Sequence, residues 1–218
     1  MTAQWGRRRL LGAVVVWAAA AGGRAAANGK GAMMDGFDEA QLKLEVSVQP
    51  DEGFVAVDFR LTNGSSHPVV VFDRLFATDR TGGRTVDPDL CWRWVDSDGV
   101  YAMAKIIPSV PANMLVEAPE IPYARGLAAG GVLEGRMLAP LPLDQSLPYG
   151  QAAPVPSVSE VSGVQVLLGY GIVDPEFAFV EIATPEGPVL SVRPPWAMSR
   201  HRVLRAAPVA AKLPVRRE

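Results

Sequence analysis

The sequence predicts an all-β protein, a single antiparallel sandwich of eight or nine short strands. Apolar and polar side chains alternate with a period of two in several segments, which is typical of strands with one solvated face. Glycine, proline, asparagine and aspartate separate those segments, as tight turns require. The 21 glycines and 19 prolines also interrupt almost every window long enough for a helix. With 49% hydrophobic residues, the 218-residue chain can form a substantial core.

Two early segments show the alternation most clearly. Residues 42–48 and 54–62 place apolar side chains on one face and polar or charged ones on the other. Turn residues follow each of them, at 49–53 and at 63–68. Residues 69–76 are apolar on both faces apart from one charged pair, and this pattern favours a central strand.

Six further segments complete the predicted set of strands. Two hairpins are expected, one with an Asp-Gly turn at 98–99 and one with a proline- and glycine-containing turn at 184–188. Proline-rich stretches at 108–122 and 140–156 are predicted to run as extended surface loops, because proline cannot donate to a central ladder. The six further strands are predicted at residues 90–95, 100–107, 132–138, 164–173, 177–183 and 189–193.

The chain divides into four parts. Residues 1–27 are predicted to be a signal peptide, 28–41 a linker or short helix, 42–197 the sandwich domain and 198–218 a basic tail. Residues 200–218 carry six basic side chains and one acidic one, without a clear period. The tail is therefore interpreted either as a flexible arm that contacts anionic envelope polymers or lipid head groups, or as a disordered terminus.

The N-terminal residues follow the pattern of an export signal. Three consecutive arginines precede an apolar stretch at 10–21, and small residues lead to an expected cleavage site between Ala27 and Asn28. The apolar stretch is shorter than the roughly 20 residues that a spanning helix needs, and an uncleaved anchor is the alternative. Either twin-arginine or general secretory export fits the arginines and leucines. We expect a periplasmic or secreted bacterial protein with no transmembrane span after cleavage.

Residues 42–76 contain four features in succession. They are an alternating strand, the sequence Leu61-Thr62-Asn63, a Gly/Ser turn, and Pro68 followed by three valines. Together these features resemble the paired early strands of exported bacterial immunoglobulin-like β-sandwich proteins of unassigned function. The sequence Leu-Ala-Ala-Gly-Gly at 127–131 is similar to the loop before a middle strand in such domains. The resemblance implies an immunoglobulin-like sandwich, and such modules bind proteins, polysaccharides or envelope components, or brace a neighbour. It implies no site residue, and the chain departs from antibody-type domains in having one cysteine.

The side chains needed for nucleophilic catalysis are scarce. The sequence has no Gly-x-Ser-x-Gly motif, and His67 and His201 are its two histidines. His67 lies in a predicted turn and His201 at the start of the tail, so neither is predicted to be catalytic. Cys91 lies in a predicted strand and is expected to be a small buried apolar residue. Glycine-rich phosphate-binding motifs are also absent from the sequence.

Four carboxylates around one predicted hairpin give the sharpest candidate metal site. Asp87, Asp89, Asp96 and Asp98 would offer the hard oxygen ligands that suit Ca²⁺. Their spacing lacks the further ligands and the closing glutamate of an EF-hand loop. Ordinary turn chemistry is therefore the preferred interpretation, and no metal or other cofactor is predicted.

Copper is the second metal considered, because thioethers near the imidazole of His201 would favour Cu(I). The methionines have no repeated spacing, so filling of the core is the preferred interpretation. The methionines in question are Met103, Met114, Met137 and Met198.

Two pairs of side chains are unusual for the strands in which they lie. Asp73 and Arg74 interrupt an apolar strand, which predicts a structural ion pair or exposure at the strand end, with a ligand-facing pair as the alternative. Trp92 and Trp94 share one face of their strand. They are expected to fill the core between the sheets, and an exposed sugar-stacking platform is the alternative.

These features predict a non-catalytic protein, an exported binding or structural module of the bacterial cell envelope whose partner is an envelope protein or polymer. Residues 28–199 carry twice as many acidic as basic side chains, which argues against a nucleic-acid partner. A periplasmic metal-handling protein for calcium or copper is the alternative. An envelope hydrolase is a third hypothesis, and it would need two carboxylates about 5 to 9.5 Å apart in a cleft.

Overall fold

The computed structural model describes residues 37–78, 83–116, 119–151, 156, 158–185 and 187–216, together with the backbone of Ala18 and Ala19. The predicted signal peptide and its cleavage site lie outside the described residues, apart from that dipeptide. Most of the predicted linker, up to residue 36, also lies outside them. None of the helices within these ranges is long and apolar enough to cross a membrane.

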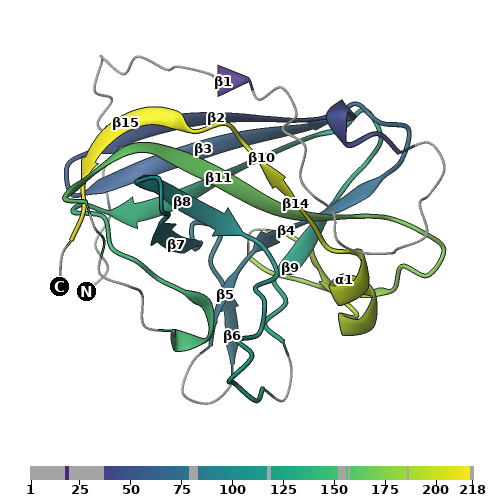
Figure 1. Cartoon of the computed structure of the whole chain (residues 1–218). Coiled ribbons are helices and arrows are strands. Elements are labelled where there is room, and N and C mark those ends of the chain that lie inside the picture. The colour runs from purple at the N-terminus through teal and green to yellow at the C-terminus, as the bar shows by residue number, and fades with distance from the viewer. Residues whose placement is uncertain are drawn as a thin grey trace.

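Two β-sheets pack against each other to form a sandwich (Figure 1). Sheet A consists of β1 (Ala18–Ala19), β2 (Leu42–Asp51), β3 (Phe54–Asn63) and β10 (Val132–Pro140). It is antiparallel in the order β1-β2-β3-β10, and the hairpin β2–β3 pairs without interruption along its full length. The predicted alternation is confirmed here, because the apolar side chains face the other sheet and the charged ones face outward. This regularity gives sheet A one dry face and one polar face.

Sheet B is larger and has strands on both sides of one long strand, β11. Its strands are β4 (Val69–Arg74), β7 (Trp92–Val95), β8 (Val100–Lys105), β9 (Tyr123–Leu127), β11 (Glu160–Ile172), β12 (Phe179–Ile182), β13 (Val189–Val192), β14 (Arg202–Arg205) and β15 (Val209–Pro214). One edge of β11 pairs with β15 and then β14, and the other pairs with β8 and then β4. β8 runs parallel to β11, so the sandwich is mixed and the expectation of purely antiparallel sheets is wrong.

Short elements complete the structure. They are the hairpin of β5 (Phe76–Thr78) and β6 (Arg84–Val86), the helix α1 (Pro194–Arg200), and the 3₁₀ turns η1 (Glu39–Gln41) and η2 (Pro148–Gly150). The β5–β6 hairpin projects away from the two sheets in Figure 1. The turn η1 lies within the segment that was predicted to be a linker or short helix.

β4 and β8 meet end to end on the same edge of β11. β8 is parallel to β11 and ends at Lys105, opposite Leu168. β4 is antiparallel to β11 and reaches Tyr170 through Val71. The carboxyl ends of the two strands therefore arrive at one place from opposite directions. We call this place the β4–β8 junction, and the charged side chains described below gather at it.

Sheet B has apolar side chains packed on both of its faces. The core between the sheets contains the inward side chains of both, while α1 covers part of the outer face of sheet B. Under α1, Trp196 and Ala197 pack against Val70 and Phe72 of β4. The sequence did not predict α1, because prolines were expected to interrupt helices, although proline fits the first turn of a helix, as in α1.

The two tryptophans of β7 lie on the outer face of sheet B. In the β7–β8 register Trp92 is opposite Ala104 and Trp94 is opposite Ala102, and these side chains form a separate cluster with Leu167. The inward positions of β8 are occupied by Tyr101 and Met103 instead. The prediction that the tryptophans fill the inter-sheet core is therefore wrong, because the register of β7 turns them to the opposite face.

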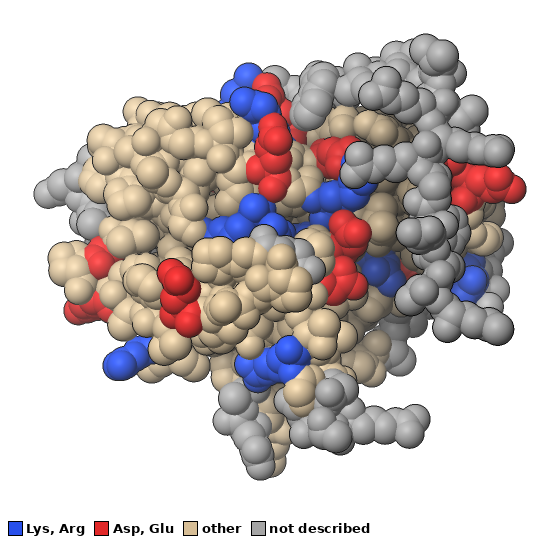
Figure 2. Space-filling model, turned by 180° about the vertical axis from the view of Figure 1, so that it is seen from behind, with Lys and Arg blue, Asp and Glu red and all other residues tan. Residues whose placement is uncertain are grey.

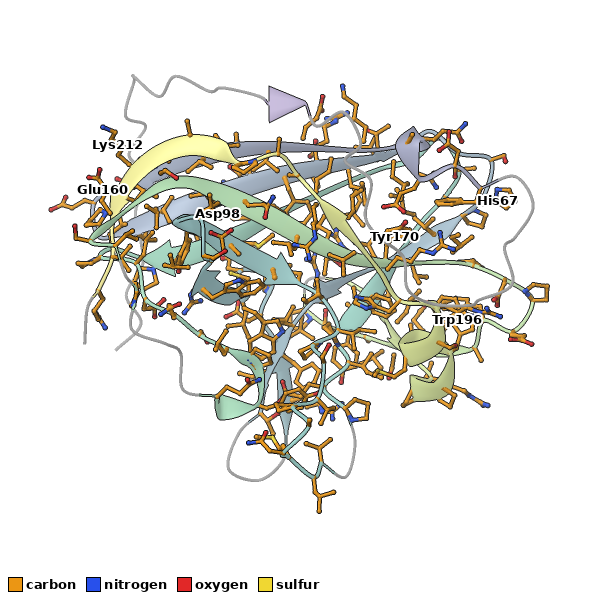
Figure 3. The ribbon with its side chains drawn as sticks, viewed as in Figure 1. His67, Asp98, Glu160, Tyr170, Trp196 and Lys212 are labelled. Carbon is orange, nitrogen blue, oxygen red and sulfur yellow. The ribbon has the colours of Figure 1, made fainter. Side chains whose placement is uncertain are left out.

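The C-terminal segment is part of the sandwich. β14 and β15 pair with β11, and Val209, Leu213 and Val215 are buried in the inter-sheet core. Lys212 and Glu160 lie at the same end of the sandwich, far from His67 (Figure 3). The expectation of a flexible arm or a disordered terminus is wrong, and the domain extends beyond residue 197. Pairing depends on backbone hydrogen bonds to β11, which the side-chain pattern does not reveal.

Candidate functional site

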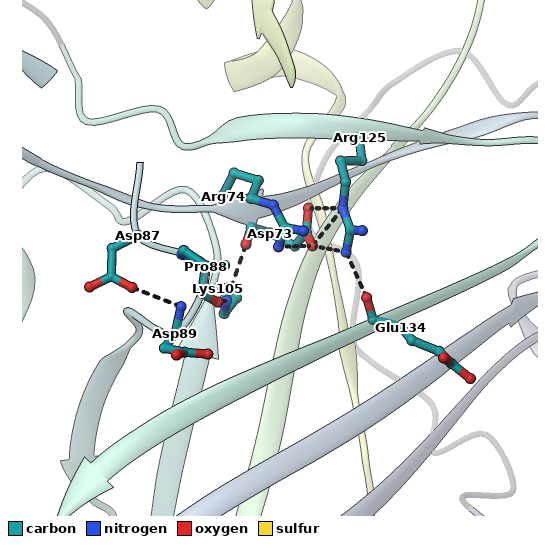
Figure 4. A network of polar contacts seen from close by, with 8 residues as sticks. All are labelled: Asp73, Arg74, Asp87, Pro88, Asp89, Lys105, Arg125 and Glu134. Atoms are coloured by element: carbon teal, nitrogen blue, oxygen red, sulfur yellow. Dashed lines mark hydrogen bonds and ion pairs between the residues drawn. The ribbon is translucent and has the colours of Figure 1, made fainter. Parts of the chain in front are cut away.

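The β4–β8 junction holds a buried cluster of charged side chains (Figure 4). The carboxylate of Asp73 is fully buried and accepts hydrogen bonds from Arg125, whose Nε lies 3.0 Å from Oδ2. The guanidinium of Arg74 also donates to Asp73 Oδ2, at 3.0 Å. Arg125 donates in addition to the carbonyl of Glu134 on β10, at 2.9 Å, and so links sheet B to sheet A. The predicted structural ion pair of Asp73 and Arg74 is confirmed, with Arg125 as a second cation.

Lys105 is the third cation of this cluster and is fully buried. Its ammonium donates to the backbone carbonyl of Asp73, at 3.2 Å, and to that of Pro88. Burial lowers the pKa of Lys105 to about 8, and the Asp73 carboxylate opposes that shift. The lysine therefore ties the segment before β7 to the end of β4. Its role is to hold the junction together.

A second polar network fixes the chain on the other side of β7. Arg93 makes a two-point contact with Asp144, at 2.9 and 3.2 Å, and the hydroxyl of Tyr101 donates to the Asp144 carbonyl at 2.7 Å. Cys91 is fully buried nearby, as predicted, and burial raises its pKa to about 11. A thiol with a raised pKa is a poor nucleophile at neutral pH. This region therefore braces β7 and offers no reactive group.

A cavity of about 210 Å³ lies next to the β4–β8 junction, between β5, β7 and the segment that leads into β9. We call it the β5–β7 cavity, and its lining residues are Leu75, Phe76, Thr78, Trp92, Glu120 and Pro122. The Phe76 ring has two neighbours, because the Arg84 guanidinium lies 4.4 Å from its ring centre and the Tyr123 ring 5.3 Å away. Most of the lining residues of the cavity are apolar, as in small-molecule sites.

Two of the lining residues have polar groups in unusual states. The indole Nε1 of Trp92 is buried, is not exposed to the cavity, and has no hydrogen-bond partner among the described residues. An unsatisfied buried donor costs about 1–3 kcal/mol. Burial raises the pKa of Glu120, which Arg84 opposes, and the Glu120 backbone N–H is anchored by the hydroxyl of Tyr149 at 3.1 Å. A cavity lined by two aromatic side chains and by a glutamate with a raised pKa is a candidate binding site.

A larger depression, of about 430 Å³, lies on sheet A and is lined by residues of β2, β3 and β10. Its charged groups are already paired, as in the contact of Arg60 with Glu134 at 2.7 Å. Figure 2 likewise shows acidic and basic side chains interspersed on one face of the molecule. Size alone does not make this depression the better candidate, because Phe59, the one aromatic residue among its described lining residues, is itself almost fully buried.

The four aspartates proposed as calcium ligands act within their own turns. Asp87 accepts from the backbone N–H of Asp89 at 2.9 Å. Asp96 accepts from the N–H groups of Asp98 and Val100, both at 2.9 Å, and so caps the turn between β7 and β8. Within the described ranges, no group of three or more His, Cys, Asp or Glu side chains is placed to hold a metal ion. The geometry of these aspartates is that of turn residues.

The methionines lie in different parts of the fold, and Met198 is the one on the helix that His201 follows. Met103 and Met137 are buried in the inter-sheet core, whereas Met198 is exposed on α1. His67 lies in the turn after β3. His201 follows α1, accepts from the Ile107 N–H at 3.3 Å, and has its pKa lowered to about 4 by burial.

Of the residues that line the cavity, the sequence pattern indicated only Trp92 as unusual. Phe76 belongs to a predicted strand that in fact breaks at Leu75 before β5. Glu120 stands between prolines in a predicted surface loop, where a carboxylate carries no signal of its own. The segments that contain Phe76, Trp92 and Glu120 come together because β4 and β8 pair with the same edge of β11. Comparisons with family models, curated proteins and solved structures gave no match to this chain.

Proposed function

We propose that this protein is an exported, non-catalytic binding module of the bacterial cell envelope, and that the β5–β7 cavity is its binding site. One observation carries the proposal: a small cavity beside the β4–β8 junction is lined by the aromatic side chains of Trp92 and Phe76 together with Glu120. Aromatic side chains with a few polar groups in a cavity are typical of small-molecule binding sites. The N-terminal pattern of arginines and apolar residues supports export.

The number of carboxylates in the cavity favours a binding role over a hydrolytic one. Glu120 is the one carboxylate among the described residues that line the cavity. Glycoside hydrolysis by the common mechanism needs two carboxylates on either side of the bond that breaks. The metal-handling alternative finds no comparable support, since the proposed aspartate ligands are engaged in turns.

The immunoglobulin-like character of the sandwich is part of the proposal. In its favour, Asn63 is buried and its amide donates to the carbonyl of Ala128 at 3.1 Å, which joins the two segments on which the resemblance rests. The amide also donates to the His67 carbonyl at 2.9 Å and closes the turn after β3. The parallel pairing of β8 with β11 departs from a purely antiparallel sandwich.

The proposal is tested by expressing the full chain in a bacterium that recognises its signal. The mass of the recovered protein and the fraction that sediments with washed cell envelopes are measured for the wild type, Trp92→Leu and Trp94→Leu. Trp94 is the matched control, because it shares the face of β7 with Trp92 but does not line the cavity. We expect a chain that begins at Asn28 and sediments with envelopes, and a severalfold lower sedimenting fraction for Trp92→Leu alone.

Two results would overturn the proposal. An intact N-terminus on protein found in the cytoplasm would remove the export claim. Equal retention of the wild type and Trp92→Leu would remove the cavity as the binding site. Circular dichroism of both purified variants confirms that they are folded before retention is compared.

A further inference from the structure

The outer edge of β2 is a surface of sheet A that the proposed function does not use. β2 has ten residues, pairs with β3 without a bulge, and forms one edge of sheet A apart from the two residues of β1. Its one proline, Pro50, lies near the end of the strand. The unpaired N–H and C=O groups of a long, regular edge strand can pair with another chain. Such an edge is therefore a candidate interaction surface.

The hairpin of β2 and β3 determines which backbone groups of β2 face outward. The N–H of Gly64 donates to the carbonyl of Gln41 at 2.9 Å, and this pair continues the register of the hairpin. Antiparallel strands use alternate residues for the hydrogen bonds to one neighbour, so the odd-numbered residues of β2 bond to β3. The N–H and C=O groups of Leu44, Val46 and Val48 therefore point away from β3, towards the edge.

The structure already contains an antiparallel strand on this edge. β1 pairs with β2 at Val46, which lies opposite Ala18 (Figure 1). The neighbouring outward positions, Leu44 and Val48, have no strand partner on this side among the described residues. β1 belongs to the predicted signal peptide, so removal of that peptide would free the backbone of Val46 as well.

We propose that, after the signal peptide is removed, the β2 edge binds the β2 edge of a second copy of this chain, in an antiparallel, two-fold symmetric pair centred on Val46. Sheet A then continues from one copy into the other, and the same surface is used twice, as in other isologous interfaces. This inference goes beyond the binding cavity. It rests on one part of the proposed function, the removal of the signal peptide.

The register follows from the residues of β2. Outward backbone groups near the middle of the strand meet when the two-fold axis passes through residue 45, 46 or 47. An axis at Glu45 places two carboxylates directly opposite one another, which is destabilising. An axis at Ser47 places Pro50 opposite Leu44, where a hydrogen bond is lost because proline has no N–H. An axis at Val46 avoids both costs.

The polar side chains of β2 fit the register centred on Val46. In this register Lys43 of one copy lies opposite Gln49 of the other, and Glu45 lies opposite Ser47. Each charged side chain therefore faces a neutral polar one. Within each copy, Lys43 Nζ lies 2.7 Å from Glu45 Oε1, so the carboxylate near the axis already has a cation. The pairing thus opposes no like charges in these positions.

The test measures the association of the mature chain. It is produced directly from Asn28, so the result does not depend on cleavage in the cell. Sedimentation velocity is recorded from about 1 to 200 μM, and we expect a monomer–dimer equilibrium with a dissociation constant on the order of 10 μM. Strand pairing buries less area than a standard interface does, so the dimer should be weak.

Amide hydrogen exchange then identifies the surface. The N–H groups of Leu44, Val46 and Val48 should become more protected as the protein concentration rises. Those of Glu45 and Ser47 bond to β3 and should be protected at every concentration. Only pairing at the outer edge of β2 predicts this alternation along one strand.

Charge variants at position 49 test the register. Gln49→Lys places a lysine opposite Lys43 twice in the dimer and should weaken association by about tenfold. Gln49→Glu places a carboxylate there and should strengthen it severalfold. Val132→Lys is the matched control, because it adds the same charge at an exposed position of β10, on the opposite edge of sheet A. It should associate as the wild type does, and circular dichroism confirms that each variant is folded.

The outcomes separate this inference from the proposed function. A mature chain that stays monomeric at every concentration would overturn the inference, whereas envelope retention that depends on Trp92 would still support the binding function. Equal effects of Gln49→Lys and Val132→Lys, or a dimer whose β2 amides gain no protection, would also overturn it. If the chain recovered from cells keeps residues 1–27 but the chain from Asn28 dimerises as described, the export claim fails and the edge pairing stands.

Discussion

Sheet A and sheet B differ in how far their ion-paired side chains are exposed to water. Sheet A keeps one face in water, and its ion pairs, such as Arg136 with Asp58 at 2.7 Å, join exposed groups across neighbouring strands. In sheet B the charged cluster around Asp73 is buried at the junction of two strands. A buried charge of this kind must be paired, whereas the exposed charges of sheet A are stabilised by water as well. An ion pair therefore contributes differently to stability in these two places.

The largest expected effect comes from shortening sheet B. A chain that ends at Pro208 loses β15, which pairs with β11, and the buried side chains of Val209, Leu213 and Val215. Each of these contributes about 1.5–3 kcal/mol by burial. Their sum, with the lost ladder, is comparable to the whole stability of a domain, about 5–15 kcal/mol. We expect the shortened chain to show no cooperative unfolding in urea, followed by circular dichroism.

A chain that lacks only residues 217 and 218 is the matched control, because these lie beyond the end of β15. It should unfold as the full chain does. A tail that did not contribute to the sandwich would give the same urea midpoint for both truncations.

The next effect concerns the buried charge of sheet B. Asp73→Asn removes the carboxylate that faces Arg74 and Arg125 and that raises the pKa of Lys105. Breaking a buried pair in this way destabilises proteins by about 3–5 kcal/mol. Glu134→Gln, which removes the exposed partner of Arg60 in sheet A, should change the free energy of unfolding by less than about 1 kcal/mol. Urea denaturation measures both, and equal effects would erase the distinction between the sheets.

The same contrast decides how much of the fold the sequence could predict. The strands of sheet A were predicted nearly to their ends, because one wet face imposes a period of two on residues such as those of β2 and β3. In sheet B the strands β9, β14 and β15 were missed. β15 buries every second residue, an alternation that was present in the sequence but overlooked. β9 and β14 have only five and four residues, and backbone pairing with neighbouring strands specifies them.

The candidate site was less predictable than the fold. Trp92 was recognisable as unusual, but its face depended on the register of β7 against β8. Glu120 and Phe76 both line the cavity because β4 and β8, which are distant in the sequence, pair with the same edge of β11. A local sequence pattern does not predict pairing between distant strands. The ion pair of Asp73 was predictable, because a charge in an apolar strand demands a partner.

A pH titration tests the covered outer face of sheet B. Burial lowers the pKa of His201 to about 4 from its usual 6.5, so between these values the unfolded state binds more protons than the folded state. Stability is therefore complete above pH 6.5, falls as the pH decreases towards 4, and stays at its lower level below that. The shift corresponds to a loss of about 3 kcal/mol.

The measurement compares urea unfolding of the wild type and His201→Gln at several pH values. Other acidic groups titrate in both proteins, so the difference between the two isolates His201. We expect the wild type to lose stability relative to the variant as the pH falls from 6.5 to 4. A difference that does not change over this range would show that His201 is exposed and that α1 does not seal this face.

A smaller effect is expected where α1 approaches β11. A Cβ atom at Gly171 would lie 2.7 Å from the ring of Trp196, closer than packed atoms allow, and that ring is buried. Gly171→Ala should therefore push α1 outward and destabilise the protein by about 1–3 kcal/mol. Gly126→Ala on β9 is the matched control, because a Cβ there meets nothing within 4 Å. Thermal unfolding distinguishes the two, and an unchanged midpoint for Gly171→Ala would contradict tight packing of the helix.

The smallest effect is expected on the polar face of sheet A. Arg136 donates to Asp58 at 2.7 Å, but the arginine side chain is 54% exposed, so water and salt screen the pair. A double-mutant cycle with Arg136→Gln and Asp58→Asn should give a coupling free energy below about 1 kcal/mol. Raising the salt concentration should reduce it further, whereas the effect of Asp73→Asn in sheet B should hardly change. A large coupling that resists salt would mean that the outer face of sheet A is also shielded from water, and the contrast between the two sheets would then rest on burial of apolar side chains alone.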